Sequence, residues 1–197
     1  MIVLNRYYSK WQALPEMIRA FILKGLLLLI IWKSLYLFLF LPHRLLDKPL
    51  TNSIAIVTTF TLNLLSSDRS YSTVPAINHY IEDGQPKLQD AMVIYHKGKR
   101  SLSIADPCNG LELLVLYIGF IICLPAKRLR KAVFIISGFV IIWILNVLRC
   151  AGLSYLFDNN PDLGDFAHHY LFKFIVYSCI FCIWLLYSKK LFYAKAQ

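Results

Sequence analysis

The chain has 197 residues, of which 58% are hydrophobic and only 16% are charged. Its mean hydropathy of +0.56 is too high for an ordinary soluble domain, and the apolar residues come in long blocks. A formal net charge of +10 would indicate nucleic-acid binding in a soluble protein. Here many basic residues lie near the ends of apolar blocks, where they orient membrane helices. We therefore predict one integral membrane domain over residues 1–197, with the lipid bilayer as a partner and no nucleic acid.

Four apolar blocks have the length of about 17–25 residues that a helix needs to cross a bilayer. They are residues 17–40, 109–125, 132–150 and 168–187. The first is too long for a signal peptide, and no small-residue cleavage site follows it. The sequence therefore predicts an all-α integral membrane protein with a bundle of four transmembrane helices.

The charges of the connecting segments predict which side of the membrane each one occupies. Residues 126–131 (AKRLRK) carry four basic residues and no acid, which favours the cytoplasm. Residues 157–167 carry three acids and no Lys or Arg, which allows them to lie outside. Both terminal segments are basic, so we expect both termini in the cytoplasm. Arg44 and Lys48, just after the first block, weakly favour the opposite orientation.

Residues 50–66 are apolar but interrupted by eight Thr, Asn and Ser residues. We expect an interfacial or re-entrant helix on the outer side, because a fifth span would place the N-terminus or residues 126–131 outside. A fifth span is the alternative. Residues 67–107 then form an external segment, in which apolar runs on both sides of a Lys-Gly-Lys turn predict a small β-hairpin. Such a hairpin is suited either to pair with an extended peptide by strand addition or simply to cap the bundle.

Cys108 is the first candidate for chemistry. It follows Asp106 and Pro107, which suit the cap and the first position of the next helix. In the first turn of that helix, free backbone N–H groups and the helix dipole would favour the thiolate that a cysteine nucleophile needs. The alternative is an inert buried thiol, as most membrane cysteines are. Glu112 lies four residues later on the same face and would pair with Arg149, orient a histidine or form a structural contact.

Arg149 and the pair His168-His169 border two other apolar blocks at the same predicted outer depth. Arg149 ends the third block, and Asn146 shares its helix face. Its guanidinium could bind the oxyanion formed when a thiolate attacks a carbonyl, orient a substrate, or only reach lipid headgroups. A histidine could take the thiol proton and return it to a leaving amine, or be an ordinary interface residue. Periodicity does not choose between the two histidines.

Three motifs in this order resemble those of the exosortase/archaeosortase family: CNGLELL at the head of one block, N-x-x-R near the end of the next, and a histidine that opens the last. The resemblance covers roughly residues 100–188, and the chain looks like a compact type of this family. It implies that the nucleophile is Cys108, followed by Asn109 within the C-[SN]-G motif. It also implies that the arginine is Arg149 and the histidine is His168, with His169 as the rival.

The resemblance implies a sortase-like cysteine peptidase or transpeptidase of the bacterial inner membrane, with its active site on the external side. Its substrates would be secreted proteins with a C-terminal sorting tail, made of a short motif, an apolar span and a basic cluster. Cys108 would form a thioester, which water or an acceptor would resolve; a lipid or a glycan is a candidate acceptor. No metal or organic cofactor is expected, and the sequence contains no zinc-ligand spacing.

The residues leave two other classes of function open. A non-catalytic membrane assembly factor for exopolysaccharide or surface-protein export would not need the thiol of Cys108. A thiol–disulfide oxidoreductase would need two cysteines on one side, for which Cys108 and Cys150 form the plausible pair. A transporter is disfavoured because no predicted span carries paired charges near its middle.

Overall fold

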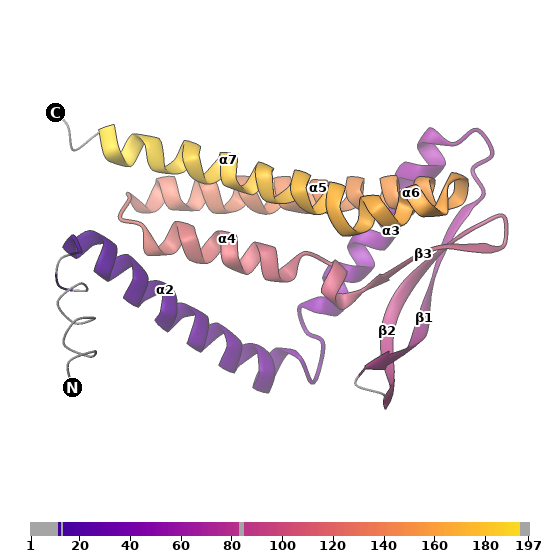
Figure 1. The fold of residues 1–197 in the computed structure, drawn as a ribbon, viewed down its shortest axis with the longest axis horizontal. Coiled ribbons are helices and arrows are strands. Elements are labelled where there is room, and N and C mark those ends of the chain that lie inside the picture. The colour runs from indigo at the N-terminus through magenta and orange to yellow at the C-terminus, as the bar shows by residue number, and fades with distance from the viewer. Residues whose placement is uncertain (1–11, 13, 83–84, 194–197) are drawn as a thin grey trace.

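The computed structural model describes residues 12, 14–82 and 85–193, which form a helical bundle with a small sheet at one end (Figure 1). Helix α2 (Glu16–Leu35) continues through a π-helical turn, η1 (Tyr36–Phe40). The other elements, in chain order, are α3 (Asp47–Leu65), β1 (Tyr71–Glu82), β2 (Gln85–His96), β3 (Lys99–Ala105), the 3₁₀ turn η2 (Asp106–Cys108), α4 (Leu111–Cys123), α5 (Arg128–Asn159), α6 (Pro161–Phe166), the π-helical turn η3 (Ala167–Leu171) and α7 (Phe172–Tyr193).

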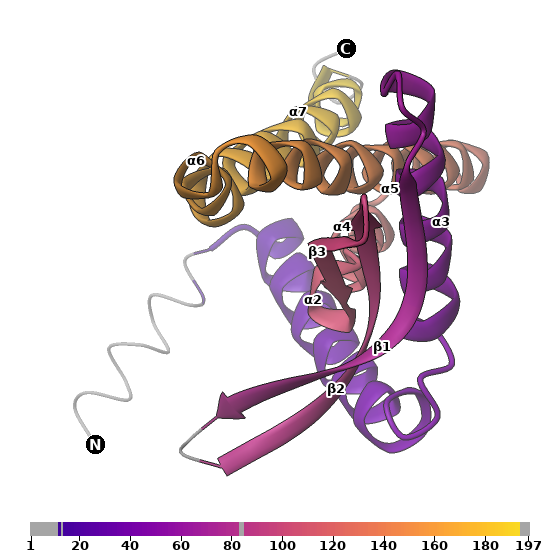
Figure 2. The same cartoon turned by 90° about the vertical axis from the view of Figure 1, so that its right-hand side faces the viewer.

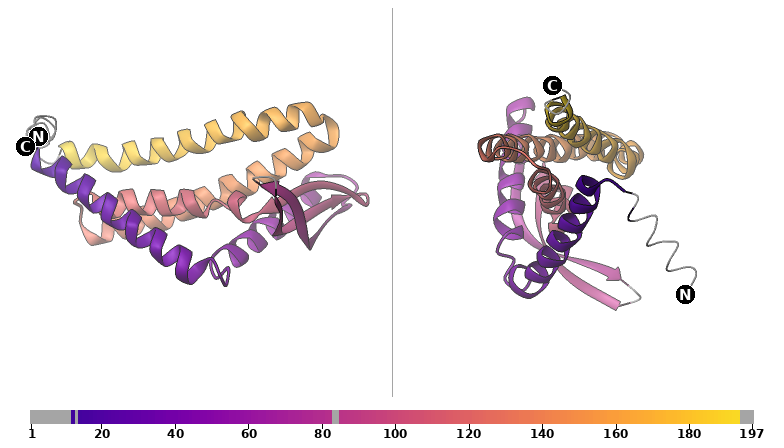
Figure 3. Two further views of the ribbon diagram at one scale, coloured as in Figure 1. Left: turned by 60° about the horizontal axis from the view of Figure 1, so that its bottom comes forward. Right: turned by 90° about the vertical axis from the view of Figure 1, so that its left-hand side faces the viewer.

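The bundle has two unlike ends (Figures 1 and 3). The three strands, α3 and α6 gather at one of them, which we call the sheet end. The start of α2, the α4–α5 connection and the end of α7 lie at the opposite end. That end is rich in basic residues, which include Arg19, Lys127, Arg128, Arg130, Lys131 and Lys189. Helix α2 therefore begins, and α7 ends, on the same side of the bundle. That this side is cytoplasmic stays a prediction.

Within the described residues, three helical segments are long and apolar enough to cross a membrane: Ile18–Phe40, Arg128–Asn159 and Pro161–Lys189. They contain three of the four predicted blocks. The remaining block, residues 109–125, forms only the 13-residue α4. At 1.5 Å per residue this helix is about 20 Å long, which is short of a bilayer core of ~30 Å. Four or five spans are thus not confirmed, because a turn before α4 and a proline after it shorten that helix.

Helix α3 forms where the interfacial or re-entrant helix was predicted, at residues 50–66. It is not among the segments that could span a membrane. One face packs against the sheet and α5 and buries residues such as Ile54 and Leu62 (Figure 2). Two of its hydroxyl groups, those of Thr59 and Thr61, donate to backbone carbonyls one turn earlier, whereas the buried hydroxyl of Thr58 has no partner among the described residues. Its depth in a membrane stays a prediction.

Residues 67–107 form a three-stranded antiparallel sheet of order β1-β2-β3, instead of a single hairpin. The predicted hairpin is confirmed as β2–β3, and its turn places Lys97 and Gly98 in the left-handed conformation. The sequence analysis missed β1, which pairs with β2 along all twelve of its residues. The Asn63 side chain of α3 binds the backbone N–H and C=O of Tyr71 at 2.9 and 2.8 Å, which connects β1 to the helix.

Helix α5 is longer than the block that predicted it. The block ended at residue 150, but α5 continues to Asn159 and packs against β3. There the hydroxyl groups of Ser154 and Ser101 lie 2.6 Å apart. The sequence predicted that Arg149 lies at the end of its helix, and this prediction was wrong. Arg149 lies in the long second half of α5, which joins the apolar bundle to the sheet end.

Candidate active site

Cys108 lies in a tight turn between β3 and α4. The residues Asp106–Cys108 form η2, and α4 begins only at Leu111. The prediction that Cys108 occupies the first turn of this helix was therefore wrong, and Asp106 does not cap it. Instead, Oδ1 of Asn109 accepts the backbone N–H of Leu111 at 2.8 Å. The thiol is thus outside the row of free helical N–H groups that the sequence argument relied on.

The carboxylate of Asp106 is bound by Arg44 and Thr51. Arg44 donates from Nε (2.7 Å) and from a terminal nitrogen (2.8 Å) to the two carboxylate oxygens, and Thr51 Oγ1 adds a bond of 2.9 Å. Such two-point pairing fixes orientation as well as charge. The hydrogen bond to Asp106 raises the pKa of Arg44 above its ordinary value. Because Arg44 also donates to Asp90 of β2, one guanidinium connects the Cys108 turn to the sheet.

Asn109 holds the other side of the turn. It is 2% exposed, and its Nδ2 donates to Asp47 Oδ1 (2.9 Å) and Thr51 Oγ1 (3.3 Å). Asp47 is also buried and accepts the hydroxyl of Tyr36 at 3.0 Å. A buried carboxylate requires such donors, because it has lost its water. Polar contacts therefore connect η1 and the start of α3 to the turn that carries Cys108.

The carbonyl oxygen of Cys108 accepts hydrogen bonds from α5. A terminal nitrogen of Arg149 donates to it at 2.7 Å, and Nδ2 of Asn146 donates at 3.4 Å. Gly110 permits this approach, since its φ is 79° and an added Cβ would lie 2.5 Å from Asn146 Nδ2. The structure thus brings Arg149 and Asn146 to the residue that the sequence proposed as nucleophile. Nε of Arg149 is buried and has no hydrogen-bond partner within the described chain.

The two histidines of η3 face different surroundings. His169 is exposed, and its Nε2 lies 3.3 Å from Asp165. His168 is half-buried, and its Nδ1 is buried without a hydrogen-bond partner among residues 12, 14–82 and 85–193. A π-helical turn is rare and is often found at functional sites. Of the two, His168 is the imidazole directed into the protein.

A close contact between α5 and α7 aligns these groups. A Cβ added to Gly152 would lie 2.7 Å from the ring of Phe172. Arg149 lies one turn before Gly152 and shares its helix face, and His168 lies in η3, directly before the start of α7 at Phe172. Cys108 and Phe172 both pack against the buried cluster that contains Cys150 and Ala167. The structure therefore gathers all three predicted catalytic residues at the sheet end of the bundle.

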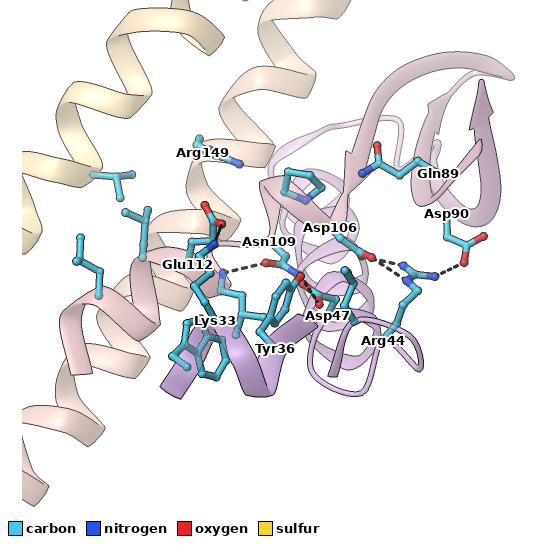
Figure 4. Close-up of a pocket in the computed structure, with 18 of the residues that line it drawn as sticks. Lys33, Tyr36, Arg44, Asp47, Gln89, Asp90, Asp106, Asn109, Glu112 and Arg149 are labelled. Carbon is cyan, nitrogen blue, oxygen red and sulfur yellow. Dashed lines mark hydrogen bonds and ion pairs between the residues drawn. The ribbon is translucent and has the colours of Figure 1, made fainter. Parts of the chain in front are cut away.

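A cavity of about 830 Å³ lies beside the Cys108 turn (Figure 4). Arg149 of α5 and Gln89 of β2 are both among the residues that line it. Of the predicted catalytic residues, Arg149 lines the cavity, whereas Cys108 and His168 do not. Arg149 thus connects the cavity to the carbonyl of Cys108. The charged lining residues balance, with four basic and four acidic side chains: Lys33, Arg44, Arg149 and Lys173, and Asp47, Asp90, Asp106 and Glu112.

Glu112 does not pair with Arg149, which corrects one of the predicted roles. Its carboxylate lies 3.4 Å from Nζ of Lys33 on α2, and both side chains are largely exposed. An exposed pair of this kind contributes little to stability. It does place one charge from α2 and one from α4 at the rim of the cavity.

The sequence profile described as transmembrane exosortase matches residues 9–187, which is nearly the whole chain. The chain belongs to the transmembrane exosortase family. The family region therefore includes α2, α3 and the sheet, beyond the part in which the motifs were recognised. No curated protein and no solved structure matches the chain.

The network that supports Cys108 in this family member was missed by the sequence analysis. One signal was available, because Arg44 is a basic residue at the end predicted to be external, where positive residues are less expected. Its ion pair with Asp106 accounts for that position. Asp47 and Thr51 gave no comparable signal, and their contacts with Asn109 and Asp106 join residues more than fifty positions apart in sequence.

Gly110→Ala should destabilise the protein more than Gly98→Ala does. Both glycines have a positive φ, so both substitutions introduce backbone strain of about 1 kcal/mol. Only Gly110 has a close neighbour, Asn146, so its substitution adds about 1–3 kcal/mol of overpacking. Thermal unfolding in detergent measures both losses. Equal losses would contradict the close contact between the Cys108 turn and α5.

Proposed function

We propose that this protein is a membrane cysteine peptidase or transpeptidase that cleaves the C-terminal sorting tail of secreted proteins through a thioester on Cys108. The observation that carries the proposal is the position of Arg149, which lines the cavity and donates to the Cys108 carbonyl at 2.7 Å. His168 supports it, since it presents a buried imidazole nitrogen with no partner in the described residues. Membership of the transmembrane exosortase family supports this reaction class.

In the proposed reaction, the imidazole of His168 accepts the thiol proton of Cys108. The sulfur attacks the scissile carbonyl carbon, and the negative charge that develops on the oxygen is stabilised by the guanidinium of Arg149. The C–N bond then breaks, and His168 returns its proton to the leaving amine. Water, or an amine or hydroxyl of an acceptor, attacks the thioester and restores the thiol. A lipid or a glycan is the candidate acceptor.

The placement of the site at the sheet end suits a substrate that is anchored by its own apolar span. If the basic end of the bundle is cytoplasmic, the sheet end faces the outside of the bacterial inner membrane. A substrate span lying beside the bundle would then present the preceding motif at the level of Arg149. This orientation is part of the proposal.

Cys108→Ala should abolish cleavage of a sorting-tail reporter, because no other group replaces the nucleophile. The reporter is a secreted protein fused to a tail from the same genome, with a polar motif, an apolar span and a basic cluster. Cys123→Ala is the matched control, since Cys123 is a buried free thiol at the far end of α4. Immunoblotting of reporter and enzyme measures cleavage and protein level. Normal cleavage by Cys108→Ala would instead favour a non-catalytic assembly factor.

Arg149→Lys should slow cleavage by roughly 100-fold. An ammonium ion cannot contact the Cys108 carbonyl and a developing oxyanion with the same planar fork. Arg130→Lys serves as the control, because Arg130 is on the same helix and donates to the backbone carbonyl of Tyr187 in the bundle. Initial cleavage rates, measured at matched enzyme levels, compare the two variants. Comparable rates for the two variants would exclude a special role of Arg149.

His168→Gln should lose cleavage, whereas His169→Gln should retain most of it. Glutamine can replace a hydrogen bond but cannot shuttle a proton. His169 contacts Asp165 at the exposed surface, so its imidazole is not directed at the site. The same reporter assay compares the two variants. The reverse order of activities would assign the proton transfer to His169.

A further inference from the structure

Strand β2 has an edge that is only partly occupied. Its residues Gln85–His96 all pair with β1 on one side. On the other side, β3 pairs with β2 only from His96 to Ala91, where Ala105 is the last partner. The chain then leaves the sheet through η2. Among residues 12, 14–82 and 85–193, the stretch Gln85–Asp90 therefore has a strand on one side only, and Figure 2 shows this part of the β1–β2 hairpin projecting beyond β3.

The backbone groups at this edge can be assigned from printed contacts. The N–H and C=O of Tyr71 both bind Asn63 on α3, so they point away from β2. Neighbouring residues of a strand point in alternate directions, so the even-numbered residues of β1 bind β2. With the observed register, their partners are the odd-numbered residues of β2. The even-numbered residues, including Leu88 and Asp90, therefore direct their N–H and C=O groups to the open edge.

The prolines of the hairpin agree with this assignment. A proline lacks an N–H and is tolerated in a sheet only where the ladder does not need one. Pro75 is an odd-numbered residue of β1 and faces the outer edge of the sheet. Pro86 is an even-numbered residue of β2 and faces the open edge beyond Leu88. Neither proline removes a hydrogen bond between the two strands.

The open edge borders the cavity beside the Cys108 turn. Leu88, Gln89 and Asp90 line the cavity that Arg149 also lines. A chain paired there would continue the line of β3, next to the turn that carries Cys108. Arg44 connects the two places, because it donates to both Asp90 and Asp106.

We propose that the Leu88–Asp90 edge of β2 receives an extended stretch of the substrate polypeptide, next to the scissile bond, as an added strand. The proposal rests on the proposed function and names how the same site holds its substrate. Backbone pairing supplies affinity that tolerates different sequences, and pockets for alternate side chains supply selectivity. Leu88 is 66% exposed and Ile77 is 57% exposed, so an apolar contact for such side chains is available. An uncovered edge with exposed apolar residues is otherwise an aggregation hazard.

Leu88→Pro should slow cleavage of the sorting-tail reporter by roughly tenfold, because it removes one N–H from the open edge. His79→Pro is the matched control, since His79 lies opposite Leu88 and its N–H faces the outer edge. Leu88→Ala is the second control, because it keeps the N–H and removes the side chain. We expect both control variants to cleave the reporter faster than Leu88→Pro does. Equal rates for Leu88→Pro and wild type, or equal losses for Leu88→Pro and His79→Pro, would overturn the proposal.

Disulfide cross-linking tests the same edge without turnover. Leu88→Cys is combined with Cys108→Ala, and a single cysteine is moved residue by residue through the reporter tail. Strand addition predicts cross-links at alternate tail positions, since successive side chains point to opposite faces. Cross-links without this period, or cross-links only between two copies of the enzyme, would refute it. Cleavage by the wild type and its loss in Cys108→Ala test the proposed function separately, so the two failures are distinguishable.

Discussion

The hydrogen bond from Arg149 to the carbonyl oxygen of Cys108 connects the two parts of this molecule at 2.7 Å. Arg149 belongs to a long apolar helix, where a charged group is costly unless it has a partner. The Cys108 turn belongs to the polar sheet end, and its carbonyl supplies that partner. The position of the turn relative to the bundle depends on this contact and on the nearby Asn146. Arg149 also lines the cavity beside the turn.

The sheet end satisfies its buried polar groups by contacts between elements that are distant in sequence. Asp106 is bound by Arg44 and Thr51, and Asn109 is bound to Asp47 and Thr51. Each of these side chains would be costly to bury without its partners. Of the polar residues that made residues 50–66 a poor membrane span, Thr51 belongs to this network, whereas Asn63 binds β1. Thr51 and Asp47, at the start of α3, support the Cys108 turn.

Local signals in the sequence predicted part of this structure. The apolar blocks predicted the three spanning segments, and the Lys-Gly-Lys turn predicted β2–β3, because both patterns act over short distances. Strand β1 was missed because Pro75 interrupts it, and only the register with β2 shows that this proline faces an outer edge. The short length of α4 was also missed, since the helix begins only after the left-handed Gly110 and ends before Pro125.

The candidate site was also predicted only in part. The order of the three motifs predicted that Cys108, Arg149 and a histidine would be neighbours, and the structure gathers them at one end. The sequence could not show that Asp106 binds Arg44, because the two residues lie 62 positions apart. It also could not choose between adjacent histidines. That choice depends on the helical turn in which they lie, since one residue along a helix changes direction by about 100°.

The π-helical turn η3 has a consequence for the phase of the last helix. In this turn the N–H of Phe172 donates to the carbonyl of Ala167, five residues earlier. One extra residue is therefore accommodated without breaking the helical rod, and every side chain before it is rotated relative to those after it. Helix α6 can then direct one row of side chains to the sheet end, while α7 directs a different row to the bundle. The helical segment Pro161–Lys189 is therefore continuous, but side chains before and after η3 point in different directions around its axis. His168 lies within this turn.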